Sequence, residues 1–210
     1  MGVYINYCLI IVPIDAELLK VYTDLQAQFK VTNEGTIDEY LGMKVERCED
    51  KTMKLLQSIL TQQLLYKMGF NHCTKWRSTP ALSSQIFGRD LEGNLKLTSW
   101  NYRSILGKLN YLAKSTRPVI AYAIRQWARF ATDPKEGHVH AMLWIGRYLH
   151  TTKYKGLVYR TQNHSFNLWC NADFSANWSP EIAHIDSSTA SSRMGYIITF
   201  AGCTITWMSK

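Results

Sequence analysis

Residues 100–118 read WNYRSILGKLNYLAKSTRP, and VIAYAIRQWARF follows directly at 119–130. In the first stretch Ile105, Leu109 and Leu112 recur at helical spacing, while basic and polar residues occupy the opposite side. This pattern predicts an amphipathic helix with a core-facing stripe and a basic stripe, ending at the final proline.

Two further helices are expected to follow. Proline is well tolerated at a first helical position, so Pro118 can open a second helix that runs to about Phe130. The tetrapeptide DPKE at 133–136 has the form of a capping box, with Asp133 accepting from the amides of the first turn. A third helix is therefore predicted from this point to about residue 151.

Positive charge is concentrated on this helical unit. Residues 101–160 carry eleven Lys and Arg against two acids, which gives +9, whereas the whole chain carries +8. Such a concentration is the electrostatic footprint of a protein that binds a phosphate backbone. A solvated helical face that is merely basic is the alternative explanation.

The residues before this unit predict strands and helices in alternation. Residues 3–12 are rich in Val, Ile and Tyr and predict a strand or a tight hairpin, after which Asp15 can cap a helix over 16–29. The apolar stripe of that helix is expected to pack on a sheet. Residues 39–47 predict a strand in which Gly42 marks the close approach of another backbone.

Later segments complete an α+β pattern. Residues 53–56 close a hairpin, 57–69 predict a helix stopped by Gly69, and 71–99 lack periodicity and form a long connector. Beyond the basic helices apolar residues recur at every second position, which predicts three strands, with a polar loop over 175–193 between the first two. These strands are expected at 165–174, 194–200 and 204–207.

Composition narrows the class of protein. The five cysteines are odd in number and never form a CxxC pair, which argues against a disulfide framework or a structural zinc site. The apolar run at 3–14 is too short to span a membrane. We therefore expect an intracellular protein of the cytoplasm or nucleus, with no membrane partner. His138 and His140 point about 200° apart on a helix and cannot share one metal ion.

Several motifs, in this order, cover nearly the whole chain: EYLGMKV at 39–45, RSTPAL at 77–82, YRSILGKLNYLAKSTRP at 102–118, RYLHTT at 147–152, GLVY at 156–159, NADF at 171–174 and GYIITFAGCTITWMSK at 195–210. With them the chain resembles the Pol polyprotein of Ty1/copia-type retrotransposons, from the end of the reverse-transcriptase palm into the ribonuclease H domain.

The resemblance implies an α+β fold in four parts. Residues 1–70 would be a palm-remnant sheet with packed helices and a hairpin like the primer grip, and 71–100 a connector. Residues 101–157 would form a basic helical thumb and connection. Residues 158–210 would be the truncated start of a ribonuclease H-like domain, with a partial three-stranded sheet.

The resemblance also implies a nucleic-acid surface. The turn of the hairpin would grip the primer end, and the basic stripe would hold an RNA–DNA or DNA duplex by its backbone, without sequence preference. The residues expected to take part are Tyr40, Leu41 and Gly42 in the turn and Arg103, Lys108, Lys114 and Arg117 on the stripe.

Catalysis is expected to be lost. The family's Tyr-x-Asp-Asp motif, whose carboxylates bind magnesium, aligns with YINY at 4–7, so that Asn6 and Tyr7 replace both carboxylates. In the ribonuclease H part Asn171 stands where the family has a metal-binding aspartate, and Asp173 remains. The rest of the palm and the fingers would lie before Met1. We expect no metal, no cofactor and no small-molecule substrate.

Three readings stay open from sequence alone. The chain is a fragment of a Ty1/copia-type reverse transcriptase without activity, or a non-catalytic nucleic-acid-binding module that uses its basic thumb, or an open reading frame that is not expressed.

Overall fold

The computed structural model describes residues 2–4, 7–70, 75–81, 93–94, 98–175, 178 and 180–210. The chain divides into two compact units, residues 1–37 and 38–210. Most of the predicted connector lies outside the described residues.

The first unit is a hairpin followed by a helix. Strands β1 (Gly2–Tyr4) and β2 (Tyr7–Leu9) pair antiparallel, so the hairpin alternative for residues 3–12 is confirmed. Helix α1 (Asp15–Gln28) also forms, but Asp15 is its first residue and not its cap. None of the residues of α1 is buried, and Leu19 remains 66% exposed. The predicted packing of α1 on a sheet is wrong for this unit, because a two-stranded hairpin offers little surface to cover a helix.

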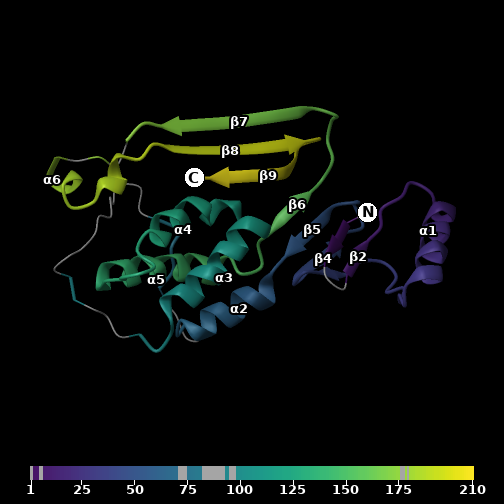
Figure 1. Ribbon diagram of the computed structural model, residues 1–210, viewed down its shortest axis with the longest axis horizontal. Coiled ribbons are helices and arrows are strands. Elements are labelled where there is room, and N and C mark those ends of the chain that lie inside the picture. The colour runs from purple at the N-terminus through teal and green to yellow at the C-terminus, as the bar shows by residue number, and fades with distance from the viewer. Residues whose placement is uncertain are drawn as a thin grey trace. The chain divides into compact units, whose positions relative to one another are not determined.

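The second unit begins with a sheet of four short antiparallel strands (Figure 1). In order across the sheet they are β3 (Glu39–Tyr40), β4 (Met43–Arg47), β5 (Met53–Leu56) and β6 (Leu157–Tyr159). The last strand comes from a part of the chain that follows the basic helices, and it pairs with β5. This sheet therefore joins segments that lie a hundred residues apart.

A turn replaces the single strand predicted over 39–47. Leu41 and Gly42 both have positive φ, 52° and 69°, and connect β3 to β4. A two-residue hairpin turn of type I′ requires positive φ at both central positions, so the glycine serves the turn. Nothing lies within 4 Å of the position that a Cβ at Gly42 would take, so the expected close approach of another backbone is wrong.

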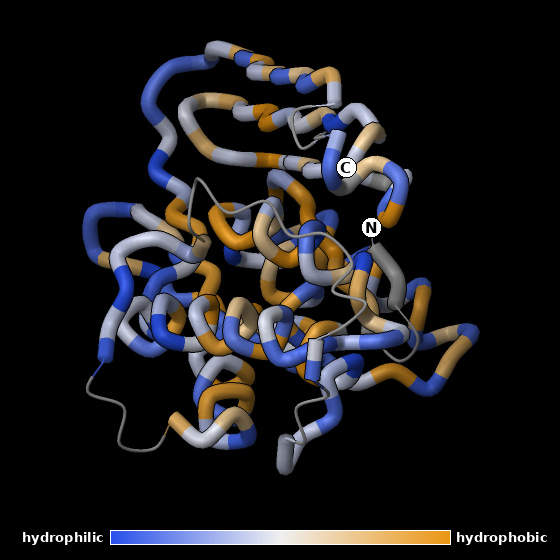
Figure 2. The backbone as a smooth tube through the Cα atoms, turned by 90° about the vertical axis from the view of Figure 1, so that its left-hand side faces the viewer, coloured by the Kyte–Doolittle hydropathy of each residue, from blue (hydrophilic) through white to orange (hydrophobic). Residues whose placement is uncertain are grey.

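Helices form the core of the second unit. They are α2 (Ser58–Lys67), α3 (Tyr102–Ser115), a 3₁₀ turn η1 (Pro118–Ile120), α4 (Ala121–Ala128) and α5 (Glu136–Thr151). Figure 2 shows hydrophobic residues concentrated among these helices. Leu64, Leu109, Leu112, Ile145 and Leu149 are fully buried there. The amphipathic pattern that predicted the first helix is confirmed, with Asn101 capping it through a bond from the Ser104 amide.

The start of α5 differs from the prediction. Lys135 occupies the N-cap position, and its backbone N–H donates to Nδ1 of His138 over 3.0 Å. The imidazole is buried and stacks on Phe130 with ring centroids 3.9 Å apart. That stacking holds the His138 Nδ1 acceptor next to the Lys135 amide, so the N-cap is Lys135, two residues after the predicted Asp133. The Asp133 carboxylate instead pairs with the Lys135 ammonium.

The C-terminal part of the unit is a three-stranded antiparallel sheet, as predicted. Its strands are β7 (Phe166–Asp173), β8 (Arg193–Phe200) and β9 (Cys203–Ser209), in that order. The predicted loop between β7 and β8 contains a short helix α6 (Pro180–Ala183) and a 3₁₀ turn η2 (Ser187–Ala190). Strand β9 lies nearest the helices in Figure 1, and Trp207 Nε1 donates to the Ala113 carbonyl over 2.8 Å.

The fold is thus mixed α and β, and in the second unit a four-stranded and a three-stranded antiparallel sheet accompany the helical core. Among the described residues, no helix has the length and apolar character needed to cross a membrane. The four-part division at residues 70, 100 and 157 stays a prediction.

Candidate nucleic-acid interface

One side of α3 is exposed along its whole length. Arg103, Gly107, Asn110 and Lys114 follow at spacings of three and four residues and are all exposed. The two basic residues are separated by about 16 Å along the helix axis. Arg103 Nε donates to the Ala131 carbonyl over 2.9 Å, which holds this guanidinium at the surface.

The hairpin turn lies against the same helix. The Tyr111 hydroxyl on α3 donates a hydrogen bond to the Leu41 carbonyl in the turn, across 70 residues of sequence. Leu41 is half-buried and Tyr111 is exposed. The structure therefore brings together two groups of residues that the sequence analysis named separately, the turn at 40–42 and the basic stripe.

A second lysine approaches the stripe from α2. The pKa of Lys108 is lowered, chiefly by a hydrogen bond with the Lys67 side chain and then by burial and the charge of Lys67. Two ammonium groups close together repel each other, and an anion bound between them would relieve the repulsion. The sequence analysis missed Lys67, because it belongs to another helix and no local pattern connects it with Lys108.

Arg117 is not at the surface. It is 3% exposed, and its Nη1 donates to the carbonyls of Thr152 and Lys155 over 2.7 and 3.2 Å. Its Nη2 donates to the Thr152 hydroxyl over 2.5 Å. Burial lowers the pKa of this guanidinium. Arg117 therefore binds the end of α5 and is left out of the surface considered below.

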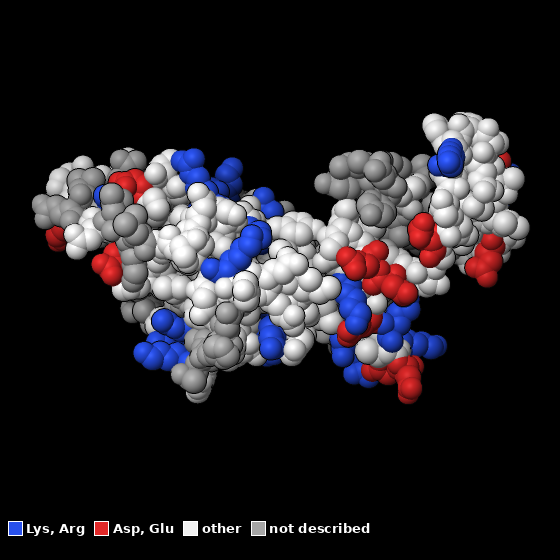
Figure 3. Space-filling view, turned by 90° about the horizontal axis from the view of Figure 1, so that it is seen from below, with Lys and Arg blue, Asp and Glu red and all other residues white. Residues whose placement is uncertain are grey.

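Three other bases of the helical unit form ion pairs with acids of this chain. Arg129 pairs with Asp186, Lys135 with Asp133 and Arg160 with Asp50. Once these three and the buried Arg117 are set aside, seven of the eleven bases remain, and none of the seven has an acid partner among the described residues: Arg103, Lys108, Lys114, Arg125, Arg147, Lys153 and Lys155. Figure 3 shows that basic side chains on one face form separate groups with uncharged surface between them.

Relatives of this chain are found among retrotransposon proteins. It is 26% identical over 211 residues to the putative transposon Ty5-1 protein of Saccharomyces cerevisiae, with all of this chain aligned. It is 28% identical over 213 residues to the retrovirus-related Pol polyprotein from transposon TNT 1-94 of Nicotiana tabacum. The corresponding polyprotein from transposon RE1 of Arabidopsis thaliana is 29% identical over 188 residues.

The chain is a homologue of Ty1/copia-like Pol polyproteins. The alignments cover 99% and 89% of it in the two plant cases. This Pol homologue spans 65% of the Ty5-1 protein but only 15% and 12% of the two plant polyproteins. No family model and no solved structure matches it.

The structure places only some of the residues that the resemblance aligned with catalytic positions. Tyr7 begins β2, and Asn6 lies outside the described residues. Asn171 and Asp173 lie near the end of β7, opposite Gly195 and Arg193 on β8. Within the described part of the chain, no three His, Cys, Asp or Glu side chains are grouped so that they could hold a metal ion.

Proposed function

We propose that this Pol homologue derives from the end of a reverse-transcriptase palm and the start of ribonuclease H, and that it has no polymerase activity. Two-metal catalysis needs carboxylates that hold the ions and neutralise their charge. By the resemblance, the amide of Asn6 and the phenol of Tyr7 stand in their place. Neither group is anionic at neutral pH, and hard dications select anionic oxygen ligands. Asn171 makes the same change in the ribonuclease H part.

Primer extension tests the loss of catalysis. The purified chain is incubated with a primed RNA template, deoxynucleotides and Mg²⁺ or Mn²⁺, with the variant Asn6→Ala/Tyr7→Ala as the matched control. We expect no extension by either protein. Extension by the natural chain that disappears in the variant would overturn the proposal, whereas extension that persists in both would indicate a contaminating polymerase.

A second function, nucleic-acid binding, is favoured by one observation. The bond between Tyr111 and the Leu41 carbonyl holds the hairpin turn beside the exposed basic side of α3. A duplex lying along α3 would then meet the turn and the basic side chains on one surface. We propose that this surface binds an RNA–DNA or DNA duplex by its phosphate backbone. Phosphate contacts fix position but carry no sequence information, so binding would be non-specific.

The size of the electrostatic contribution follows from the number of cations. Arg103, Lys108 and Lys114 on α3 and Lys67 on α2 make four contacts if each reaches one phosphate. Each neutralised phosphate contributes about −0.9 to the slope of log K against log salt, so the expected slope is about −3.6.

Fluorescence anisotropy on a labelled RNA–DNA hybrid over a salt series measures that slope. The triple variant Arg103→Ala/Lys108→Ala/Lys114→Ala should lower its magnitude by about 2.7 and weaken binding equally for unrelated sequences. The control Lys20→Ala/Lys30→Ala/Arg160→Ala removes the same charge from other parts of the chain. A salt-independent affinity, or an equal loss in both triple variants, would remove α3 as the binding surface.

A further inference from the structure

One face of the C-terminal sheet is apolar and uncovered. Successive residues of a strand point to opposite faces, so the even-numbered residues of β7 and β8 share one face. The strand register pairs them directly across the two strands. We call this surface the even face; it consists of Phe166, Leu168, Cys170, Ala172, Met194, Tyr196, Ile198 and Phe200, continued on β9 by Thr206 and Met208.

The exposure of the even face is substantial. Leu168 and Met194 are 58% and 52% exposed, and Phe166 and Phe200, which pair at one end, are exposed as well. The helices contact the sheet at the β9 side, where Trp207 reaches Ala113, so they do not cover these residues of β7. An exposed contiguous apolar area of this kind is often an interaction site.

The even face carries no charge on its three strands. The nearest charged position along β9, Lys210, follows the last residue of that strand. The opposite face is different, because Asp173 and Arg193 pair across it at one end. A chain of net charge +8 repels a second copy of itself, and a surface without charges adds no local repulsion when two copies approach.

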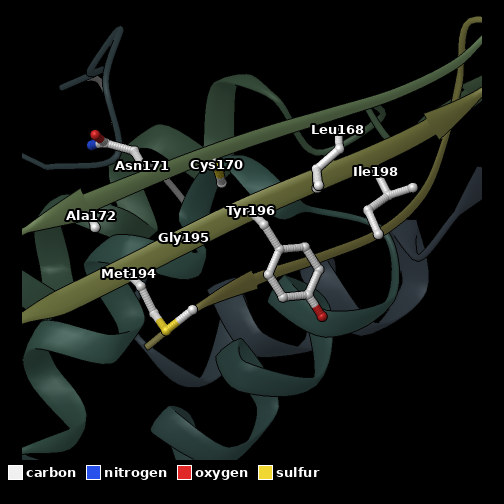
Figure 4. Close-up of a pocket in the computed structure, with 8 residues that line it drawn as sticks. All are labelled: Leu168, Cys170, Asn171, Ala172, Met194, Gly195, Tyr196 and Ile198. Carbon is white, nitrogen blue, oxygen red and sulfur yellow. The ribbon is translucent and has the colours of Figure 1, made fainter.

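The even face carries a hollow and an exposed aromatic pair. A hollow of about 390 Å³ lies over its centre, where Met194, Tyr196 and Ile198 follow one another along β8 beside Leu168, Cys170 and Ala172 of β7 (Figure 4). The exposed phenylalanine pair stands at one end of the same face. In a two-fold arrangement, an aromatic side chain of each copy can enter the hollow of the other, as an isologous interface requires.

We propose that two copies of this chain associate through their even faces into a sheet-on-sheet dimer. Eight residues at about 3.4 Å and three strands at about 4.8 Å give roughly 390 Å² of flat area per copy. Both copies together bury somewhat more than twice that area once side-chain relief is included, close to the lower limit of roughly 1,000 Å² for specific interfaces. An interface near this limit is expected to be weak and to form only at high protein concentration.

Sedimentation equilibrium of the full chain between about 1 and 200 µM tests the dimer. The variant Leu168→Lys/Met194→Lys places two charges on the even face and should weaken association at least tenfold. The matched control Trp169→Lys/Ile197→Lys places two charges at exposed positions of the opposite face, and association should be unchanged. All four side chains are exposed, so each variant should retain the fold, and circular dichroism checks that it does.

A chemical readout separates this arrangement from other modes of association. Cys170 lies on the even face, whereas Cys8 and Cys48 lie elsewhere. The rate at which maleimide labels Cys170 should fall several-fold between dilute and concentrated protein, while the rates at Cys8 and Cys48 stay constant. A monomer at 200 µM, association that responds equally to both lysine pairs, or labelling of Cys170 that is independent of concentration would each overturn the proposal.

Discussion

Replacing Arg117 by alanine should destabilise the second unit without changing its affinity for nucleic acid. The guanidinium donates to the Thr152 and Lys155 carbonyls and to the Thr152 hydroxyl, at the C-terminal end of α5. A cation at that end also interacts favourably with the helix dipole. In Arg117→Ala these acceptors lose their donor in a site that is almost closed to water.

The magnitude follows from opposing contributions. Hydrogen bonds from a charged donor stabilise by about 1.5–3 kcal/mol each, but burial of the guanidinium costs several kcal/mol. The net loss expected for Arg117→Ala is about 2–4 kcal/mol. Arg117→Met keeps most of the volume and removes the buried charge, so its expected loss is smaller, about 1–2 kcal/mol.

Urea unfolding followed by circular dichroism measures these differences, and Lys114→Ala is the control on an exposed base three residues away. The control should change the free energy of unfolding by less than about 0.5 kcal/mol. In the absence of urea, and at a temperature where all variants are folded, Arg117→Ala should leave unchanged the slope of log K for duplex binding against log salt. A loss below about 0.5 kcal/mol, or a slope reduced by about 0.9, would refute the structural role of Arg117.

Three further predictions concern single side chains. Gly156→Ala should cost about 3 kcal/mol in urea unfolding, because a Cβ there would overlap the Leu55 carbonyl oxygen; an unchanged midpoint would contradict the β5–β6 pairing. Burial raises the pKa of the Tyr102 phenol, so near pH 10 the phenol loses its proton only in the unfolded state. Stability should then fall above about pH 10, less steeply in Tyr102→Phe. Asp186→Asn takes the carboxylate from the largely buried Arg129 guanidinium 2.7 Å away, and amide exchange over 180–190 should accelerate.

Helical periodicity predicted the basic helices well because their apolar stripes are long. Ile105, Leu109 and Leu112 are all buried, and the second helix begins at Pro118 as a 3₁₀ turn. The same reasoning could not distinguish Arg117 from Lys114. A count of charges along a helix predicts the sign of the charge on its surface. Whether one guanidinium is buried depends instead on acceptors such as the Thr152 carbonyl, 35 residues further along the chain.

Turns and caps were predicted less well, because each depends on a contact that periodicity does not contain. The period-two pattern over 39–47 hid a turn at Leu41 and Gly42, although the resemblance implied a turn there. The cap of α5 depends on the stacking of His138 on Phe130. Asp186 gave no signal at all, since its partner Arg129 follows α4 more than fifty residues earlier and its own segment has no periodicity.

The helix that organises the fold also holds its other parts in place, each through a different side. Its apolar stripe packs into the core, the Tyr111 hydroxyl binds the hairpin turn, and the Ala113 carbonyl accepts from Trp207 of the C-terminal sheet. Lys114 follows Ala113 directly in the sequence yet remains exposed. Substitutions on the exposed side of α3 should therefore leave stability intact, whereas substitutions at its contacts should change stability first. That separation allows the proposed duplex-binding surface to be tested independently of folding.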